Sequence, residues 1–278
     1  MINKLFLSCD NNNILTEIQH KIDSYSSING IEIDSAAADF SEITKENHVN
    51  FLISNDSLEI KKIIKAIGPV TTAYACSEPN TDLLDELNSF HLLGIQRHLY
   101  LASDETKHLN LGKLKNSIHN AEPFVREGNL FICDFNVLRK SEVANLAFGN
   151  PSGLYSEDIS QIFRYAGMNE LNKWVILTNV DPEITDLVAQ CIWYYAEAAS
   201  IRFPDHPYFR NTVDEYVVDI SSFDTQISFY KSKVSGRWWV KIPDIKENKW
   251  KSCSYDDYKQ ACEDNVSSEL LEIISVAE

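Results

Sequence analysis

The sequence predicts an α/β fold in which a central, mostly parallel sheet is covered by helices on both faces. Short runs of apolar residues recur along the first two thirds of the chain, each about the length of one buried strand. Stretches with apolar residues at helical spacing separate these runs. Strands that are apolar on both faces and alternate with helices are typical of parallel sheets enclosed between helical layers.

The strands and helices follow one another in chain order. Six runs predict buried strands, at Leu5–Leu7, Phe51–Ile53, Thr71–Cys76, Leu92–Ile95, Leu130–Cys133 and Trp174–Leu177. The first two are each followed by a helical stripe of isoleucines, namely Ile14, Ile18 and Ile22, and then Ile60, Ile63, Ile64 and Ile67. The second of these helices stops before Gly68-Pro69, a pair that cannot continue a helix.

Two later helices have clear boundaries in the sequence. Ser156 is a candidate cap for the first, and Gly167 is the residue expected to end it in a left-handed conformation. The second opens at Asp181-Pro182, a capping residue followed by proline at the first helical position. Its apolar stripe continues to Tyr195, which indicates a helix packed on a sheet.

The character of the chain changes after Phe203–Pro207, where two prolines mark a turn or surface connection. Tyr216–Ile220 and Gln226–Tyr230 alternate like strands, and Trp238–Ile242 is expected to pair back as a β-hairpin. Further helices are predicted at Ser254–Cys262 and Ser267–Val276. We therefore divide the chain into a main α/β domain at 1–207 and a small C-terminal hairpin and helix appendage at 208–278.

Composition excludes several classes of partner. The chain has 278 residues and a formal net charge of −16, which argues against nucleic acid and against anionic membranes. The apolar run at the N-terminus is too short for a signal peptide and ends at Asp10. The six cysteines are scattered without a CxxC pair, as expected of reduced thiols in the cytoplasm. The sequence contains no GxSxG, HExxH, Walker or GxGxxG motif.

Several ordered segments of the chain resemble the formiminoglutamase-like branch of the arginase, agmatinase and formiminoglutamase (ureohydrolase) family. Leu93–His98 is similar to a family strand that reads IGxQ, and Leu130–Glu142 is similar to the segment SFDxDxxRxSD. Further similar segments are Asn150–Tyr155, Arg164–Met168, Ala189–Tyr195, Phe229–Trp239 and Cys253–Tyr255. The resemblance runs from about Thr71 to the C-terminus and is loose over the first 70 residues.

The resemblance implies a three-layer α/β/α fold and, in active members, two Mn²⁺ ions that ionise a bridging water. That hydroxide attacks a guanidinium or formimino carbon and breaks a carbon–nitrogen bond. The resemblance also implies oligomers, either of this chain with itself or with an active relative.

Most positions that the resemblance assigns to metal ligands carry other residues here. The family segment DAHxD aligns with Thr72–Cys76, so that Thr72, Tyr74 and Cys76 stand in place of Asp, His and Asp. Neutral Thr and Tyr are poor Mn²⁺ ligands, and Cys prefers softer metals. In the DxD segment, Asp134 remains and Asn136 takes the second acidic position.

Two further ligand positions come from other strand ends. The segment that resembles GGDH falls near Ile53–Ser57, where Asp56 is the acidic residue. Asn179 aligns with the glutamate of the family's YExNP segment. One clear carboxylate thus remains at positions where the resemblance implies about six charged or imidazole ligands. One carboxylate is too few to hold two divalent cations.

The sequence therefore predicts a ureohydrolase-fold pseudoenzyme without a bound cofactor, which acts through binding or regulation. Two alternatives stay open: an active C–N hydrolase with an altered metal site, and a protein that binds a small guanidino or formimino compound in the vacated crevice. Asp134 is either a remnant of a metal site or an ordinary strand-end carboxylate. Cys76 and Cys133 either form a soft-metal or thiol site with Asp134 or fill buried space.

Overall fold

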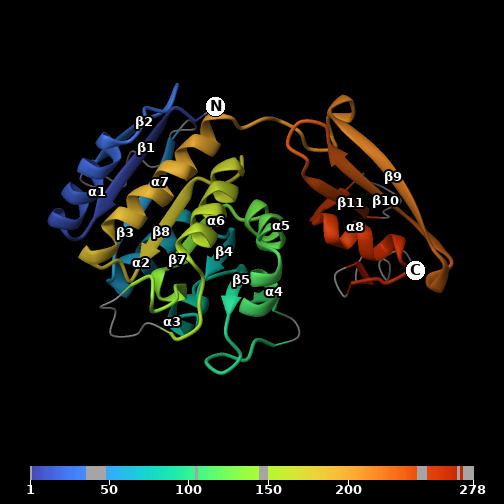
Figure 1. Cartoon of the computed structure of the whole chain (residues 1–278), viewed down its shortest axis with the longest axis horizontal. Coiled ribbons are helices and arrows are strands. Elements are labelled where there is room, and N and C mark those ends of the chain that lie inside the picture. Colours follow the sequence, from blue (N-terminus) through green and yellow to red (C-terminus); the bar gives the residue numbers. More distant parts are fainter. Residues whose placement is uncertain are drawn as a thin grey trace. The chain divides into compact units, whose positions relative to one another are not determined.

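The chain forms two compact units, Met1–Arg202 and Phe203–Glu278 (Figure 1). The computed structural model describes residues 2–35, 48–103, 106–143, 150–242, 249–267 and 270–271, and the side chain of residue 210 is not among those described. Within these ranges, no helix combines the length and the apolar character needed to cross a membrane.

The first unit contains an eight-stranded sheet in the order β2-β1-β3-β8-β7-β4-β5-β6, in which every adjacent pair is parallel (Figure 1). The strands are β1 Lys4–Cys9, β2 Glu32–Ser35, β3 His48–Ile53, β4 Thr71–Ala75, β5 Ser89–Ile95, β6 His108–Asn110, β7 Leu130–Asp134 and β8 Trp174–Thr178. Because all strands are parallel, their carboxyl ends lie along one edge of the sheet. Polar residues that follow neighbouring strands therefore meet there.

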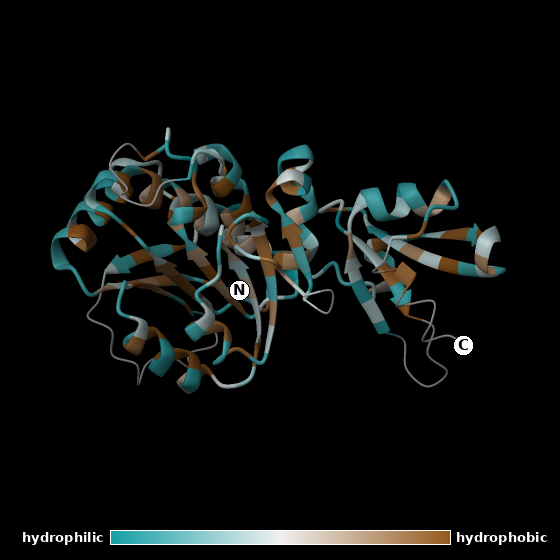
Figure 2. Cartoon of the chain, turned by 90° about the horizontal axis from the view of Figure 1, so that it is seen from below, coloured by the Kyte–Doolittle hydropathy of each residue, from teal (hydrophilic) through white to brown (hydrophobic). Residues whose placement is uncertain are grey.

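Helices cover both faces of this sheet. The helices of the first unit are α1 Asn12–Ser24, α2 Ser57–Ile67, α3 Thr81–Leu84, α4 Leu111–Asn116, α5 Ala121–Arg126, α6 Ser156–Met168 and α7 Thr185–Ser200. One core cluster joins the sheet to α1, α6 and α7, and a second joins its other face to α2 and α3. Figure 2 shows helices on both sides of the sheet, with brown, apolar stretches along the strands and alternating teal and brown along the helices.

The predicted fold class is confirmed, since the structure has the α/β/α layers and the parallel sheet. All six predicted strands are present, and the isoleucines at 14, 18, 22, 60, 63 and 64 are buried. The two short strands β2 and β6 were not predicted. Each lies at an edge of the sheet and carries mostly polar or half-exposed residues, so neither has an apolar run to reveal it.

Two predicted helix boundaries are wrong. Ser156 is the first residue of α6 and not its cap, because Tyr155 precedes the helix and Asp158 accepts a hydrogen bond from the Tyr155 backbone N–H at 2.9 Å. Gly167 lies inside α6, which ends at Met168. Its small size serves close packing on α7, since a Cβ at this position would lie 2.2 Å from the carbonyl oxygen of Tyr195.

The second unit contains a four-stranded antiparallel sheet in the order β12-β11-β10-β9 and the helix α8. Its elements are β9 Val213–Ile220, β10 Thr225–Ser232, β11 Trp238–Ile242, β12 Lys249–Cys253 and α8 Tyr255–Cys262. The predicted hairpin is β10 with β11, and β12 was not predicted. Most of the helix predicted at Ser267–Val276 lies outside the described residues. The structural units divide between Arg202 and Phe203, and the division into 1–207 and 208–278 stays a prediction.

The side chains of Trp238 and Trp239 lie on opposite faces of the second sheet. Trp238 stacks on Tyr258 of α8, with ring centroids 4.6 Å apart, whereas Trp239 lies beside His206 at 6.0 Å. Alternation along a strand separates the two rings in this way. One tryptophan therefore belongs to the core under α8 and the other to the opposite face of the sheet.

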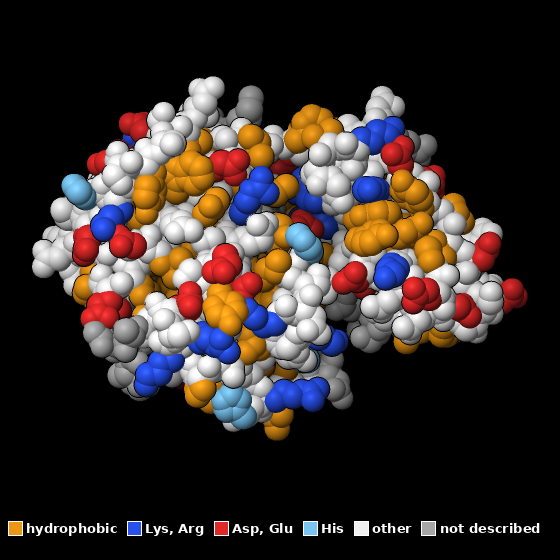
Figure 3. Space-filling model, in the orientation of Figure 1, with side chains coloured by type: hydrophobic (Ala, Val, Ile, Leu, Met, Phe, Trp, Pro, Cys, Tyr) orange, Lys and Arg blue, Asp and Glu red, His pale blue; other side chains and the backbone are white. Residues whose placement is uncertain are grey.

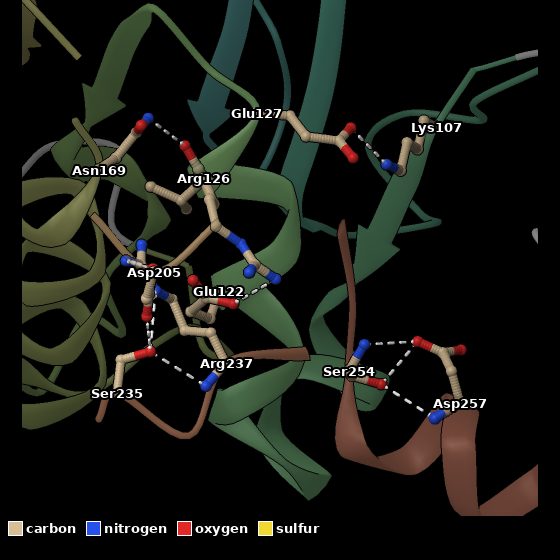
Figure 4. Close-up of polar contacts among 11 residues, drawn as sticks. Lys107, Glu122, Arg126, Glu127, Asn169, Asp205, Ser235, Arg237, Ser254 and Asp257 are labelled. Atoms are coloured by element: carbon tan, nitrogen blue, oxygen red, sulfur yellow. Dashed lines mark hydrogen bonds and ion pairs between the residues drawn. The ribbon is translucent and has the colours of Figure 1, made fainter. Parts of the chain in front are cut away.

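A buried ion pair holds the start of the second unit to its hairpin. Arg237 Nη2 lies 2.5 Å from Asp205 Oδ1, and both side chains are less than a tenth exposed (Figure 4). Ser235 Oγ also donates a hydrogen bond to Asp205, and the Arg237 guanidinium lies over the Trp239 ring at 5.9 Å. Removing one member of such a pair leaves a buried charge without its counterion.

We expect Asp205→Ala to lower the free energy of unfolding of the second unit by about 2 kcal/mol, because the Arg237 charge loses its buried counterion. Chemical denaturation followed by tryptophan fluorescence measures the change. Asp214→Ala is the matched control, since the Asp214–Lys233 pair is about half exposed and contributes little. Equal effects of the two substitutions would contradict the assignment of a structural role to the buried pair.

Candidate functional site

The candidate site lies where four adjacent strands, β3, β8, β7 and β4, end at the carboxyl edge of the sheet. Asp134 is the last residue of β7, and Asn179 directly follows β8. Asn55 follows β3 by two residues, and Cys76 directly follows β4. The topology thus brings together polar residues that are separated by up to 124 positions in the sequence.

Hydrogen bonds join these strand ends around Asp134. Its Oδ1 atom accepts a bond from Asn179 Nδ2 at 2.8 Å and another from the Asn136 backbone N–H at 2.8 Å. The Asn179 backbone N–H donates to Asn55 Oδ1 at 2.6 Å. Asn179 has a φ of 55°, a left-handed conformation that asparagine tolerates better than most residues. This conformation lets its backbone N–H bond Asn55 while its side chain bonds Asp134.

The same set of bonds continues toward β5. Ser77 Oγ donates to the Asn136 carbonyl oxygen at 3.1 Å. Gln96 Nε2 in turn lies 3.0 Å from Ser77 Oγ and 2.9 Å from the Ser152 carbonyl oxygen. We call this connected set the strand-end network, and its members are Asn55, Ser77, Gln96, Asp134, Asn136, Ser152 and Asn179.

Gln96 and Ser77 were not predicted as site residues. Gln96 lies in the segment that resembles IGxQ, but that resemblance gave it no role in the site. No sequence pattern marks Ser77. Gly94, two residues before Gln96, has a φ of 91° and would place a Cβ 2.8 Å from Val137. A glycine is therefore needed for β5 to pass this close to the loop after β7.

Asp134 is a buried carboxyl group, with 8% of its surface exposed. Burial raises its pKa above the usual value, and the hydrogen bonds from Asn179 and Asn136 act in the opposite direction. The charged form of Asp134 is therefore less favourable in the folded protein than in water. At neutral pH the buried charge of Asp134 therefore lowers the stability of the folded state.

We expect Asp134→Asn to raise the free energy of unfolding at pH 7. An acid whose pKa is higher in the folded state contributes stability at low pH, and this contribution is lost as pH rises through the folded pKa. The Asn oxygen still accepts both hydrogen bonds but carries no charge. Urea denaturation from pH 4 to pH 7 should therefore show a flatter pH dependence for the variant. Lower stability of the variant across this range would contradict the assigned cost of burying the charge.

The structure brings some of the predicted site residues together and keeps others apart. Cys76, Asp134, Asn136 and Asn179 lie at neighbouring strand ends. Thr72 pairs with Leu130, four residues before Asp134, and so lies roughly 13 Å from the strand ends. Its Oγ1 atom is buried, with no hydrogen-bond partner among the described residues.

Tyr74 is the next-to-last residue of β4 and is buried in the core under α2 and α3. Burial raises the pKa of its hydroxyl well above the usual value, so the group stays protonated. Asp56 is exposed and caps α2, where its Oδ1 accepts a hydrogen bond from the Leu58 N–H at 2.8 Å. Asn55, and not Asp56, joins the strand-end network.

The register of β4 against β7 identifies a second placement of the segment that resembles DAHxD. Ala75 pairs with Cys133, so the next residues, Cys76 and Asp134, lie side by side at the strand ends. A placement on Cys76–Asn80 sets Cys76, Glu78 and Asn80 against Asp, His and Asp. Both placements lack an imidazole, and both replace at least two of the three ligands of this segment with poorer Mn²⁺ donors.

These residues do not fit a pair of Mn²⁺ ions. Across the described ranges, no group of three or more His, Cys, Asp and Glu side chains is arranged to hold a metal. Cys76 and Cys133 are fully buried, and burial raises the pKa of both thiols well above the usual value. Thiols that stay protonated are not reactive nucleophiles, which favours the interpretation of both cysteines as buried fillers.

No protein-family model and no curated protein sequence matches the chain. Solved structures do match it. Trypanosoma cruzi formiminoglutamase with Mn²⁺ at pH 8.5 has a TM-score of 0.61 and 11% identity, over 73% of this chain and 94% of that one.

Two further solved structures give the same result. Formimidoylglutamase from Bacillus subtilis subsp. subtilis str. 168 has a TM-score of 0.57 and 12% identity, over 73% and 88% of the two chains. Proclavaminate amidino hydrolase from Streptomyces clavuligerus has a TM-score of 0.53 and 10% identity, over 72% and 93%. The chain therefore has the fold of the arginase and ureohydrolase proteins, and the resemblance in the sequence correctly predicted that fold.

Proposed function

We propose that this chain is a ureohydrolase-fold pseudoenzyme, which has kept the fold without the binuclear metal site and acts through binding. The observation that carries the proposal is the pair of hydrogen bonds at Asp134. Its Oδ1 accepts N–H groups from Asn179 and Asn136. In a metal site of this type, the carboxylate oxygen faces a cation, and the neighbouring residues supply further anionic or imidazole ligands.

The charge of the donor set supports the same conclusion. Asp134 is the one carboxylate among the seven residues of the strand-end network, and the other side chains of the network are amides and hydroxyls. A second carboxylate, Asp10 after β1, borders the network and accepts a hydrogen bond from the Asn55 backbone N–H at 3.2 Å. Affinity for divalent cations depends on the number and charge of the ligands. The Asn179 amide is neutral and donates a hydrogen bond to Asp134, so it takes the place of a ligand without attracting a cation.

An activity assay tests this proposal. The protein, supplied with excess Mn²⁺, is incubated with arginine, agmatine, formiminoglutamate and guanidino acids, and release of urea, ammonia and formamide is measured. We expect no release above that of a heat-denatured sample. Turnover that depends on Mn²⁺ and disappears in Asp134→Asn would instead favour an active hydrolase with an altered metal site.

A second candidate function is binding of a small guanidino or formimino compound at the strand ends. The buried Oδ1 atom of Asn136 has no hydrogen-bond partner among the described residues, and the backbone N–H of the same residue donates to the Asp134 carboxylate. A carboxylate and a free carbonyl oxygen together suit a ligand that carries several N–H donors and a positive charge.

Thermal shift distinguishes this candidate. A compound that binds only the folded state at 100 times its Kd stabilises that state by about 2.7 kcal/mol. We expect arginine, agmatine or formiminoglutamate to raise the Tm of the wild type and to have no effect on Asp134→Asn, which lacks the negative charge. If none of these compounds shifts the Tm, the strand ends do not bind this class of ligand.

Assembly is the remaining part of the proposal. The resemblance implies that the chain associates with itself or with an active relative. Size-exclusion chromatography with light scattering measures the mass of the particle in solution. If the protein is a monomer at all concentrations, the hypothesis of self-association is wrong. An active relative then remains as the proposed partner.

A further inference from the structure

A second site lies between the end of α1 and the middle of α7. A shallow pocket that is largely open to solvent lies there, with a volume of about 560 Å³. Its lining residues come from two segments of the first unit, namely Ser24, Tyr25, Ser26, Gln190, Trp193 and Tyr194. None of them belongs to the strand-end network. Figure 3 shows orange side chains at the surface over α7 in the orientation of Figure 1.

The aromatic walls of this pocket are held in place by hydrogen bonds at their rims. Trp193 Nε1 donates to the Ser26 carbonyl oxygen at 2.8 Å, which ties the segment after α1 to α7. The Tyr25 hydroxyl donates to the Asp186 carbonyl oxygen at 3.4 Å. Trp193 and Tyr194 meet edge to face, with ring centroids 5.4 Å apart. Rings fixed in this way lose little conformational entropy when a ligand binds.

The lining combines aromatic rings with uncharged polar groups. Three residues supply rings, and the other three supply two hydroxyls and one amide. None of the six carries a formal charge at neutral pH, since burial raises the pKa of the Tyr25 hydroxyl. The Asp186 side chain, on the residue whose carbonyl oxygen accepts from Tyr25, is paired with Lys21 at 2.5 Å.

Charge and polarity together narrow the class of ligand. An anion would find no cation in the lining, and a cation would find no carboxylate there. Ser24 Oγ already donates to the Lys21 carbonyl oxygen at 2.6 Å, and Gln190 Nε2 lies 3.5 Å from Ser160 Oγ. An entirely apolar ligand would still cover the Ser26 hydroxyl and the amide oxygen of Gln190 without giving them partners. A neutral ring with apolar C–H groups on one face and hydroxyls around its edge can pack on the aromatic rings and also form hydrogen bonds with the polar groups of the lining.

We propose that the pocket between α1 and α7 binds a neutral pyranose sugar. The C–H face of the sugar ring lies against the Trp193 ring, and Tyr194, whose ring is at 82° to that of Trp193, borders the edge of the sugar. Its hydroxyls exchange hydrogen bonds with Gln190 and with the serines at the end of α1. This site is independent of the pseudoenzyme proposal, because it shares no residue with the strand ends.

Saturation-transfer difference NMR with the full-length protein tests the proposal. The probes are glucose, galactose, mannose and N-acetylglucosamine, with tetramethylammonium and benzoate as charged probes. We expect at least one sugar to receive saturation, most strongly at its ring C–H protons. Absence of transfer to all four sugars, or transfer to tetramethylammonium or benzoate alone, would overturn the proposal.

Variants locate the binding. Trp193→Ala should weaken sugar binding by about tenfold, because it removes the largest aromatic surface of the pocket. Gln190→Ala should weaken it by a smaller factor, and its exposed position means that the variant folds even if Trp193→Ala does not. Tyr208→Ala is the control, since Tyr208 is an exposed aromatic residue of the second unit. Sugar binding unchanged in Gln190→Ala and in any folded Trp193→Ala protein would place the sugar elsewhere and overturn the proposal.

Discussion

The triple variant Cys76→Asp, Asn136→Asp, Asn179→Glu is expected to gain a Mn²⁺-dependent stability that the wild-type protein lacks. The three substitutions add anionic oxygen ligands beside Asp134, at neighbouring strand ends. Carboxylate oxygens are the ligands that Mn²⁺ prefers. Without metal, the same groups repel one another and Asp134, so the variant should be less stable than the wild type in the presence of a chelator.

Thermal unfolding of both proteins, with a chelator and then with a series of Mn²⁺ concentrations, measures the effect. At 100 times the Kd, the metal should stabilise the variant by about 2.7 kcal/mol and leave the wild-type Tm unchanged. Ca²⁺ and Zn²⁺ are informative controls for ligand type. An equal rise for wild type and variant would mean that the native residues already hold the metal.

The second large effect is expected for Gly167→Ala, which should lower the free energy of unfolding of the first unit by about 4 kcal/mol or more. Helices α6 and α7 lie side by side (Figure 1) and meet at this residue. A Cβ on Gly167 would lie 2.2 Å from the Tyr195 carbonyl oxygen and 2.9 Å from the Tyr195 Cα atom. These are backbone atoms, so the clash moves a whole helix and not only a flexible side chain.

Gly112→Ala is the matched control. Gly112 also lies in a helix, α4, but a Cβ there would meet its nearest atom, Asn110 Oδ1, at 3.5 Å. Alanine favours a helix over glycine by up to about 1 kcal/mol, so this variant should be at least as stable as the wild type. Urea denaturation followed by circular dichroism compares the two. A small loss for Gly167→Ala would show that α6 and α7 can separate at little cost.

The sequence predicted those parts of the fold that depend on local patterns. Buried strands such as β7 and β8 are continuous apolar runs, and α1 and α2 present isoleucines at helical spacing. The edge strand β2 has no such run, because half of its surface faces solvent. Gly167 was assigned to a helix end because glycine commonly occurs there, whereas its packing on Tyr195 depends on a segment 28 positions away.

The candidate site was predictable in part. The resemblance identified Asp134, Asn136 and Asn179 as residues of adjoining strand ends, and the structure joins all three by hydrogen bonds. The end of β4 was predicted to within one residue, at Cys76 against the observed Ala75, but the segment that resembles DAHxD was aligned inside this strand, on Thr72–Cys76. Pairing of β4 with β7 fixes that end and moves Thr72 away from the site. The register of β4 depends on its pairing with β7, which lies more than 50 residues away in the sequence. A local sequence pattern does not encode such a pairing.

Metal analysis of protein purified without a chelator, combined with Mn²⁺ titration by calorimetry, tests the central claim most directly. Too few charged ligands surround Asp134 to retain divalent ions, so we predict Mn²⁺ far below one ion per chain and no saturable heat of binding. Two Mn²⁺ ions per chain, lost on chelation, would contradict this account of the strand ends.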